Sequence, residues 1–238
     1  MIFLNKKRIL FISFSILISI FSTSISPTTI LVNSLPVTNL TIILDAGHGF
    51  PDGGATGKDG SIESSLNLAI TKKLQNLLEA SNCSIILTRS DENGIYEINS
   101  KSIKDKKISD MKNRLKISEN TNAELFISIH MNKLNESKYY GWQTFYKEND
   151  EISKIIASNV QQNLNNYIDI PNHRTIKPIS DIFLAKNIKI PFVLIECGFL
   201  SNDKENKLLQ DDSYQNQLAW SIYSGIMDYL KESNWLYY

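Results

Sequence analysis

Short apolar runs along the chain alternate with stretches in which apolar residues recur at helical spacing. The apolar, β-branched runs predict strands over residues 42–45, 84–88, 124–129, 141–146, 181–185 and 192–197. The helical spacing predicts helices over residues 63–80, 107–120, 150–166, 203–210 and 213–231, and the polar stretch 91–105 is predicted to be a loop. Because strands alternate with helices, we expect an α/β fold. Its single domain should hold a mostly parallel twisted sheet with helices on both faces.

The first residues of the chain have a different pattern. Basic residues at positions 6–8 precede an apolar run over 9–25, as in a secretory signal peptide. Ser24 and Ser26 suit a cleavage site, whereas Pro27 directly after them does not. Two interpretations therefore stay open for this segment, a cleaved signal peptide or an uncleaved N-terminal membrane anchor.

These patterns divide the chain into three parts. Residues 1–26 are the signal peptide or anchor, residues 27–39 are a linker, and residues 40–238 are the folded domain. Either interpretation of the first part predicts that the folded domain is exported and lies outside the cytoplasmic membrane.

Charge and cysteine content narrow the possible functions. Lys and Arg number 25, as do Asp and Glu, and no basic stripe with interleaved aromatic residues is present, so we expect no nucleic-acid partner. Cys83 and Cys197 each lie in an apolar strand pattern, which favours two separate buried thiols over a disulfide. Two cysteines without a CxxC motif exclude a zinc site built from cysteine.

Polar side chains stand where the predicted strands end. His48 follows the first strand between two glycines, His130 ends the third, and Glu196 closes the last. Glu63 begins the first predicted helix after a glycine-rich loop. The carboxyl ends of the strands line the ligand crevice of an open α/β sheet, so we expect these groups to converge. Two histidines and a carboxylate match the ligand set of a catalytic zinc, with one glutamate left to take a proton from water.

Each of these residues also has a simpler interpretation. A histidine after a strand is more often a satisfied polar group than a ligand, and Glu63 suits a helix N-terminus because of the helix dipole. Glu196 is the most informative, because a carboxylate after four apolar residues is costly to bury without a partner. His173 lies in a polar loop and is expected to be solvated.

Several motifs together resemble a known family. In chain order they are LDAGHG, GATG, Glu63 with NLA, LTR, ELFISIHMN, GWQTFY and IECGFLSN. They resemble the zinc-dependent N-acetylmuramoyl-L-alanine amidases, which cleave bacterial peptidoglycan, over nearly the whole region from Thr41 to the last helix. The likeness is greatest to the sporulation and germination amidases of the spore cortex. Phe50 and Trp142 depart from the residues common in the family, which bears on the shape of the cleft.

The resemblance implies a mechanism and residue roles. His48, Glu63 and His130 would be the zinc ligands and Glu196 the catalytic glutamate. Zinc would acidify its bound water, and Glu196 would carry the proton to the leaving amine. The bond broken would be the amide between the lactyl group of N-acetylmuramic acid and the L-alanine of the stem peptide. Arg89 and Arg114 resemble family positions and are expected to form structural pairs.

The resemblance also implies a setting. The substrate would be peptidoglycan, in the cell wall or the forespore intermembrane space. Little of the chain lies outside the predicted domain, so we expect an exported helper protein, or membrane association through the N-terminal segment, to localise the enzyme.

Two other functions stay open. One is a secreted zinc carboxypeptidase-like hydrolase, which would use the same ligand types. The other is a non-enzymatic wall-binding module, whose sign would be a lost ligand or a lost Glu196. The chain has kept all four residues.

Overall fold

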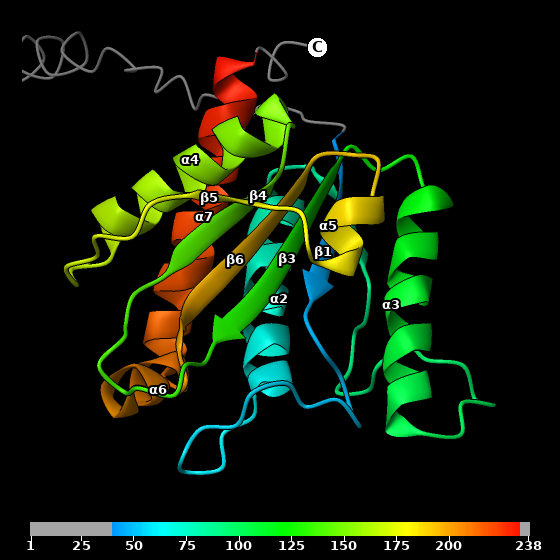
Figure 1. Ribbon diagram of the computed structural model, residues 1–238. Coiled ribbons are helices and arrows are strands. Elements are labelled where there is room, and N and C mark those ends of the chain that lie inside the picture. The colour runs from blue at the N-terminus through cyan, green and yellow to red at the C-terminus, as the bar shows by residue number, and fades with distance from the viewer. Residues whose placement is uncertain (1–39, 234–238) are drawn as a thin grey trace, which may run out of the picture. The chain divides into compact units, whose positions relative to one another are not determined.

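Six strands form one twisted sheet within residues 40–233, which the computed structural model describes (Figure 1). Their order across the sheet is β2-β1-β3-β6-β4-β5. The strands are β1 (Thr41–Ala46), β2 (Ser84–Leu87), β3 (Leu125–Asn132), β4 (Gln143–Lys147), β5 (Lys177–Ile179) and β6 (Phe192–Phe199).

The sheet is mostly parallel, which confirms the predicted fold class. β1 pairs in parallel with β2 and β3, and β3 pairs in parallel with β6. β4 runs antiparallel to β6, and β5 extends the edge in parallel with β4. Because β1, β3 and β6 are adjacent and parallel, their carboxyl ends lie side by side at the same end of the sheet.

Helices cover both faces of the sheet (Figure 1). One face packs against α2 (Glu63–Ala80), α4 (Glu151–Tyr167) and α7 (Asp212–Glu232), whose leucines and isoleucines form the larger core. The other face packs against α3 (Ile103–Glu119) and the short α5 (Phe183–Asn187) around a smaller core, and α6 (Asp203–Leu209) follows β6. In α2 the buried residues Leu66, Ile70, Leu74 and Leu78 recur every four positions, which is the helical spacing seen in the sequence.

One predicted strand and one predicted helix boundary are wrong. Residues 181–185, predicted as a strand, belong instead to a bend and to α5, and the edge strand β5 lies just before them. A short apolar run does not by itself distinguish a strand from a helical turn, and Leu184, Ala185 and Ile188 pack onto the sheet at helical spacing.

The second correction concerns α3, which begins at Ile103 within the predicted polar loop. Ser102 and Asp105 form a reciprocal capping box there, a start signal made of polar residues that an apolar pattern does not detect. Residues 1–39, on which the signal peptide, anchor and linker predictions fall, lie outside the described residues. Within 40–233, no helix has both the length and the apolar character needed to cross a bilayer. Cys83 and Cys197 are both buried thiols that are not joined by a disulfide, as predicted.

Candidate active site

The loop after β1 places His48 on the side of the sheet that α3 and α5 cover. His48 has a backbone φ of 62°, a conformation uncommon for a residue with a side chain. A Cβ at Gly47 would lie 2.3 Å from the His130 ring, so a glycine there allows that ring to lie against the loop. A Cβ at Gly54 would lie 2.5 Å from the Glu63 carboxylate. The two glycines thus leave room for the polar side chains to meet.

Glu63 is the first residue of α2 and is 3% exposed. Its Oε2 accepts a hydrogen bond from the backbone of Ala55 at 2.7 Å, and its Oε1 accepts one from the backbone of Met131 at 3.1 Å. These bonds fix the carboxylate between the loop after β1 and the end of β3. The helix-terminal position predicted for Glu63 and a ligand role are therefore compatible.

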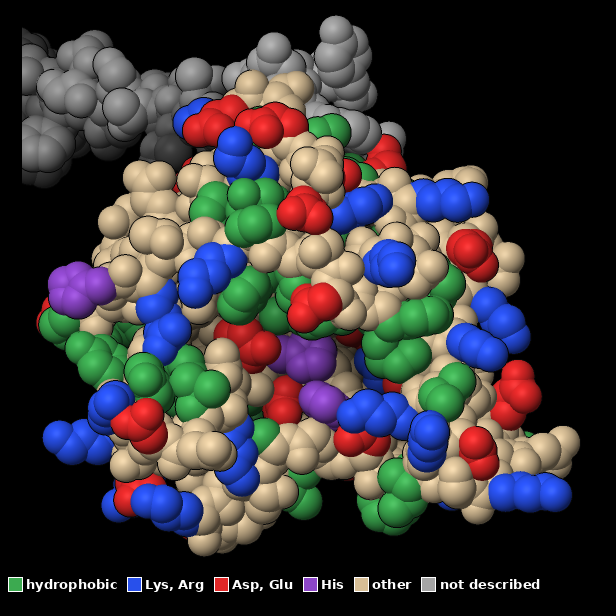
Figure 2. All heavy atoms as spheres, in the orientation of Figure 1, with side chains coloured by type: hydrophobic (Ala, Val, Ile, Leu, Met, Phe, Trp, Pro, Cys, Tyr) green, Lys and Arg blue, Asp and Glu red, His purple; other side chains and the backbone are tan. Residues whose placement is uncertain are grey.

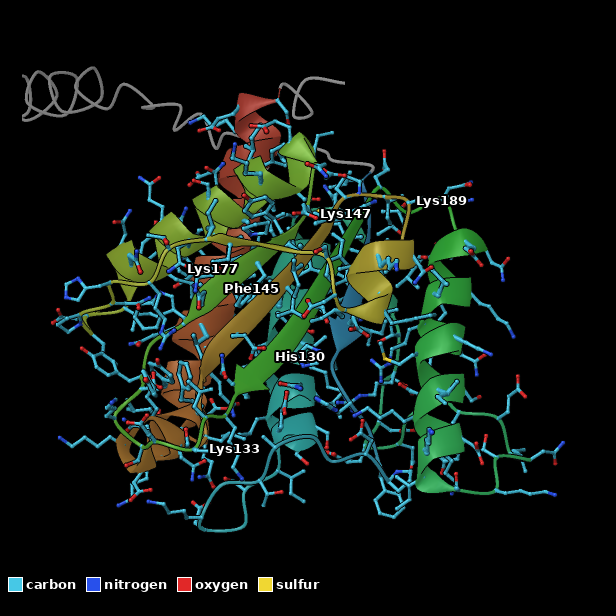
Figure 3. All side chains as sticks on the ribbon, in the orientation of Figure 1. His130, Lys133, Phe145, Lys147, Lys177 and Lys189 are labelled. Carbon is cyan, nitrogen blue, oxygen red and sulfur yellow. The ribbon has the colours of Figure 1, made fainter. Side chains whose placement is uncertain are left out.

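His130 and Glu196 are cross-strand neighbours on β3 and β6. Both follow residues of the smaller core by even steps, Phe126 on β3 and Phe192 on β6, so they face the same side of the sheet. Figure 3 shows His130 near the lower end of β3, and the last residue of β1 pairs with the residue just before His130. The strand-end placement predicted for His48, His130 and Glu196 is what the structure shows.

The structure brings three donors into one cluster. Ligand atoms of His48, Glu63 and His130 all lie within 4.8 Å of one another. Glu63 Oε1 lies 3.3 Å from His48 Nε2 and 3.1 Å from His130 Nδ1. Two imidazole nitrogens and a carboxylate around one point fit a catalytic zinc, which takes three such ligands and keeps a position open.

The charges in this cluster depend on one another. Burial lowers the pKa of His48, but hydrogen bonds to Asp52 and Glu63 outweigh it and raise the pKa to about 9. Burial raises the pKa of Glu63, but hydrogen bonds to His130 and His48 hold it well below its usual value. The raised pKa means that His48 carries a proton, whose positive charge neutralises the Glu63 carboxylate. A metal cation at the centre of these groups would neutralise the same carboxylate.

Glu196 stands apart from this cluster. Its Oε2 atom is buried and has no hydrogen-bond partner among the described residues. Burial raises the pKa of Glu196 to about 7, while the neighbouring His130 lowers it and Glu63 raises it further. A carboxyl that titrates near neutrality beside a metal site suits a group that takes and returns a proton.

Two further residues support the site and were not singled out from the sequence. Asp52 Oδ2 lies 3.0 Å from His48 Nδ1 and 3.1 Å from the ammonium of Lys107 on α3. Asn67 donates from Nδ2 to the Gly47 carbonyl at 3.0 Å and to Glu63 at 3.4 Å. The spacing of four residues between His48 and Asp52 was the available signal, because carboxylates commonly orient metal-binding histidines.

Arg89 and Arg114 belong to the scaffold, as predicted. Arg114 is buried and pairs with Asp45 on β1 and Asp110 on α3. Arg89 donates to the backbone carbonyls of Ala46, Gly47 and Ser64. Together they fix the end of β1, from which the His48 loop departs.

A cavity of about 170 Å³ opens onto these groups and is lined by His48, His130, Glu196 and residues of α3 and α5. Figure 2 shows histidine and acidic side chains gathered in a hollow at the centre of this face, with basic and hydrophobic side chains on its rim. A larger cavity of about 690 Å³, between α2 and α7, holds no comparable cluster among its lining residues. His173 is exposed and far along the chain from the cluster, in agreement with the solvated position expected for it.

Known proteins share this fold and its motifs. A family model described as N-acetylmuramoyl-L-alanine amidase matches residues 42–228. The germination-specific N-acetylmuramoyl-L-alanine amidase of Bacillus subtilis (strain 168) is 36% identical over 203 residues, which cover 84% of this chain and 83% of the relative.

Two solved amidase structures have a similar fold. The CwlD amidase from Clostridioides difficile, solved in complex with the GerS lipoprotein, is 49% identical with a TM-score of 0.79, covering 82% of this chain and 100% of that one. The catalytic domain of CwlV from Bacillus (Paenibacillus) polymyxa var. colistinus is 31% identical with a TM-score of 0.69, covering 81% and 98%. The family match spans nearly all of the described residues, including the strand-end cluster, and the chain therefore belongs to the N-acetylmuramoyl-L-alanine amidase family.

Proposed function

We propose that the protein is a zinc-dependent amidase that cleaves the bond between the lactyl group of N-acetylmuramic acid and L-alanine in peptidoglycan. One observation carries this proposal, the His48, Glu63 and His130 donor set beside the unpartnered carboxylate of Glu196. A zinc ion in such a donor set supplies Lewis acidity, which polarises a carbonyl and makes water more acidic.

The protein's own groups carry the protons. The Glu196 carboxylate, which receives no hydrogen bond from the described residues at its buried oxygen, accepts the proton of the attacking water. The same carboxyl then donates that proton to the nitrogen of the leaving alanine, so Glu196 ends the cycle ionised. Its neighbouring position to His130 on the adjacent strand places it at the edge of the donor set.

The remaining groups hold this arrangement. Asp52 accepts from His48 Nδ1 and thereby leaves Nε2 facing Glu63. The backbone amides of Ala55 and Met131 fix both oxygens of Glu63. We therefore assign His48, Glu63 and His130 as metal ligands and Glu196 as the general base and acid.

Two relatives support the biological setting that we propose. The Bacillus subtilis relative is named as germination-specific, which supports a role in the spore cortex, in an exported, extracytoplasmic compartment. The Clostridioides difficile relative was solved with a lipoprotein bound, which supports an exported helper protein for this chain also. Residues 1–39 would direct export or anchor the protein to the membrane, and residues 40–238 would form the catalytic domain.

Mass spectrometry of peptidoglycan fragments after incubation with the zinc-loaded protein tests the proposal. An amidase releases intact stem peptides and leaves glycan strands without them. Release of single amino acids would indicate the carboxypeptidase-like alternative, and wall binding without any release would indicate a binding module.

A further inference from the structure

Beyond Glu196, on the far side of the neighbouring strand β4, lies the guanidinium of Arg174. Gln143 on β4 is the cross-strand neighbour of Glu196 and is 4% exposed. Gln143 Oε1 accepts a hydrogen bond from Arg174 Nη1 at 3.3 Å, and its Nε2 donates to the Thr175 carbonyl at 2.8 Å. Arg174, in the segment that leads into β5, is thereby tied to the strand next to Glu196.

Arg174 is held in one orientation. Its Nε donates to the Tyr140 carbonyl at 2.9 Å, and its guanidinium lies 4.4 Å from the centre of the Phe199 ring. Phe199 is fully buried and pairs with Asn132, two residues beyond His130, across a register shift between β3 and β6. A guanidinium that is stacked and hydrogen-bonded in this way loses little further freedom when it binds a ligand.

This cation forms no ion pair within the described residues, although Glu205 interacts with it electrostatically at longer range. Among residues 40–233, no carboxylate lies within ion-pair distance of Arg174, and its Nη2 donates to no protein group. The nearby carboxylate of Glu205 is occupied, because its two oxygens accept from the backbone of Gly141 at 2.7 Å and of Phe199 at 2.8 Å. Arg174 is half-buried, and within residues 40–233 its Nη2 donors are not used by any protein group.

We infer that Arg174 binds a free carboxylate of the stem peptide, close to the amide that is cleaved. This inference rests on the proposed function and names a substrate subsite within it. Arg174 lies about two strand spacings from Glu196, roughly 10 Å, and an extended peptide advances about 3.3–3.6 Å per residue. The carboxylate it reads thus belongs to one of the first two or three residues of the stem.

The chemistry of the ligand agrees with this site. Guanidinium and carboxylate form paired, charge-assisted hydrogen bonds, which fix both the position and the direction of the peptide. Lys177 on β5 is exposed and pairs with Phe145 on β4 (Figure 3). Phe145 lies two residues from Gln143 on the same strand, so Lys177 adds positive charge on the face of the sheet that carries Gln143. The basic side chains on the rim of the hollow in Figure 2 are consistent with an anionic peptide on this side.

Two synthetic muramoyl peptides test the inference, identical except that the carboxylate of the second stem residue is free in one and amidated in the other. For the zinc-loaded wild type, we expect a KM about 10- to 100-fold lower for the free carboxylate, with similar kcat, since charge-assisted bonds of this kind stabilise both substrate and transition state. Arg174→Gln should abolish the difference by raising only the KM of the free-carboxylate peptide. Arg174→Lys, which keeps the charge and loses the fork, should fall between.

The amidated peptide is the internal control for folding, because a structural defect in Arg174→Gln would slow both substrates alike. Lys154→Gln, on an exposed position of α4 across the sheet, should keep the full discrimination. Equal KM values for the wild type, or unchanged discrimination in Arg174→Gln, would overturn the inference. So would loss of the discrimination in the presence of modest inorganic phosphate, which would show a general anion site.

A binding measurement separates this inference from the proposed function. Calorimetric titration of Glu196→Gln with the two free stem peptides should show the same preference for the carboxylate without any turnover. Failure of the wild type to cleave either muramoyl peptide, with this preference intact, would count against the amidase assignment alone. Equal binding of both peptides would count against Arg174 alone.

Discussion

Glu63 is the residue on which the geometry of the site depends. Its Oε1 lies within 3.3 Å of a nitrogen of each histidine ring, and the backbone amides of Met131 and Ala55 donate to Oε1 and Oε2. Glu196, by contrast, has a buried oxygen that accepts no hydrogen bond from any residue within 40–233. The two glutamates thus have opposite environments, and this difference supports the roles proposed for them, Glu63 as a metal ligand and Glu196 in proton transfer.

Asp52 should set the affinity of the site for zinc through His48. Asp52→Asn removes the carboxylate 3.0 Å from His48 Nδ1, and loss of such a partner typically weakens metal binding about 10- to 100-fold. Competition with a chelator measures this. Asp203 is an exposed carboxylate that pairs with Lys58, and Asp203→Asn is the matched control, which should bind zinc like the wild type. Unchanged affinity in Asp52→Asn would remove Asp52 from the site.

Glu196 should make the metal-free protein less stable as the pH rises. Its folded pKa of about 7 lies above the ordinary value of 4.5, so the folded state holds this proton more tightly than the unfolded state. The stabilisation is complete below 4.5, declines as the pH rises toward about 7, and is absent above it.

Comparison with Glu196→Gln isolates this effect, because the amide is neutral at every pH and the histidines are common to both proteins. Urea unfolding at pH 5 and pH 8 should show the variant gaining stability over the wild type at the higher pH. A constant difference at the two pH values would contradict the raised pKa.

At the scale of elements, the placement of the four site residues was predictable because each stands at the end of a strand or the start of a helix. Contacts between residues that are distant in the sequence were not predictable in this way. Asp52 meets Lys107 of α3, and Gln143 meets Glu196, only through strand order and register, which no local pattern encodes. The wrongly predicted strand at 181–185 and the predicted start of α3, which was four residues too late, have a related cause. Core packing and a polar cap determine where those elements form.

Arg114 should be essential for docking α3 on β1. Among the described residues, its removal leaves Asp45, which is 1% exposed, with only the hydroxyl donors of Thr88 and Ser128. Breaking a buried pair in this way costs about 3–5 kcal/mol, so Arg114→Met should lower the free energy of unfolding by that amount. Lys116→Met, an exposed residue of the same helix, should change it by less than about 0.5 kcal/mol. Similar urea midpoints for the two variants would contradict the assignment.

At the scale of the whole molecule, zinc should link the loop after β1, helix α2 and strand β3. A ligand that binds only the folded state at 100 times its Kd adds about 2.7 kcal/mol, which corresponds to several degrees in Tm for a domain of this size. A chelator should therefore lower the Tm of the wild type, and His130→Ala should show no such shift. The chain's third histidine supplies the control, because exposed His173→Ala should respond like the wild type. A shift in His130→Ala equal to that of the wild type would exclude this ligand set.

The most direct test of the central claim is a pair of measurements on Glu196→Gln, its zinc content and its rate of muramoyl–alanine cleavage. The variant keeps the size of the side chain and loses the base, so zinc should stay bound while the rate falls about 10²- to 10⁴-fold. Glu63→Gln should lose zinc first and activity as a consequence, with partial recovery when zinc is added. Near wild-type cleavage by Glu196→Gln with zinc in place would contradict the account.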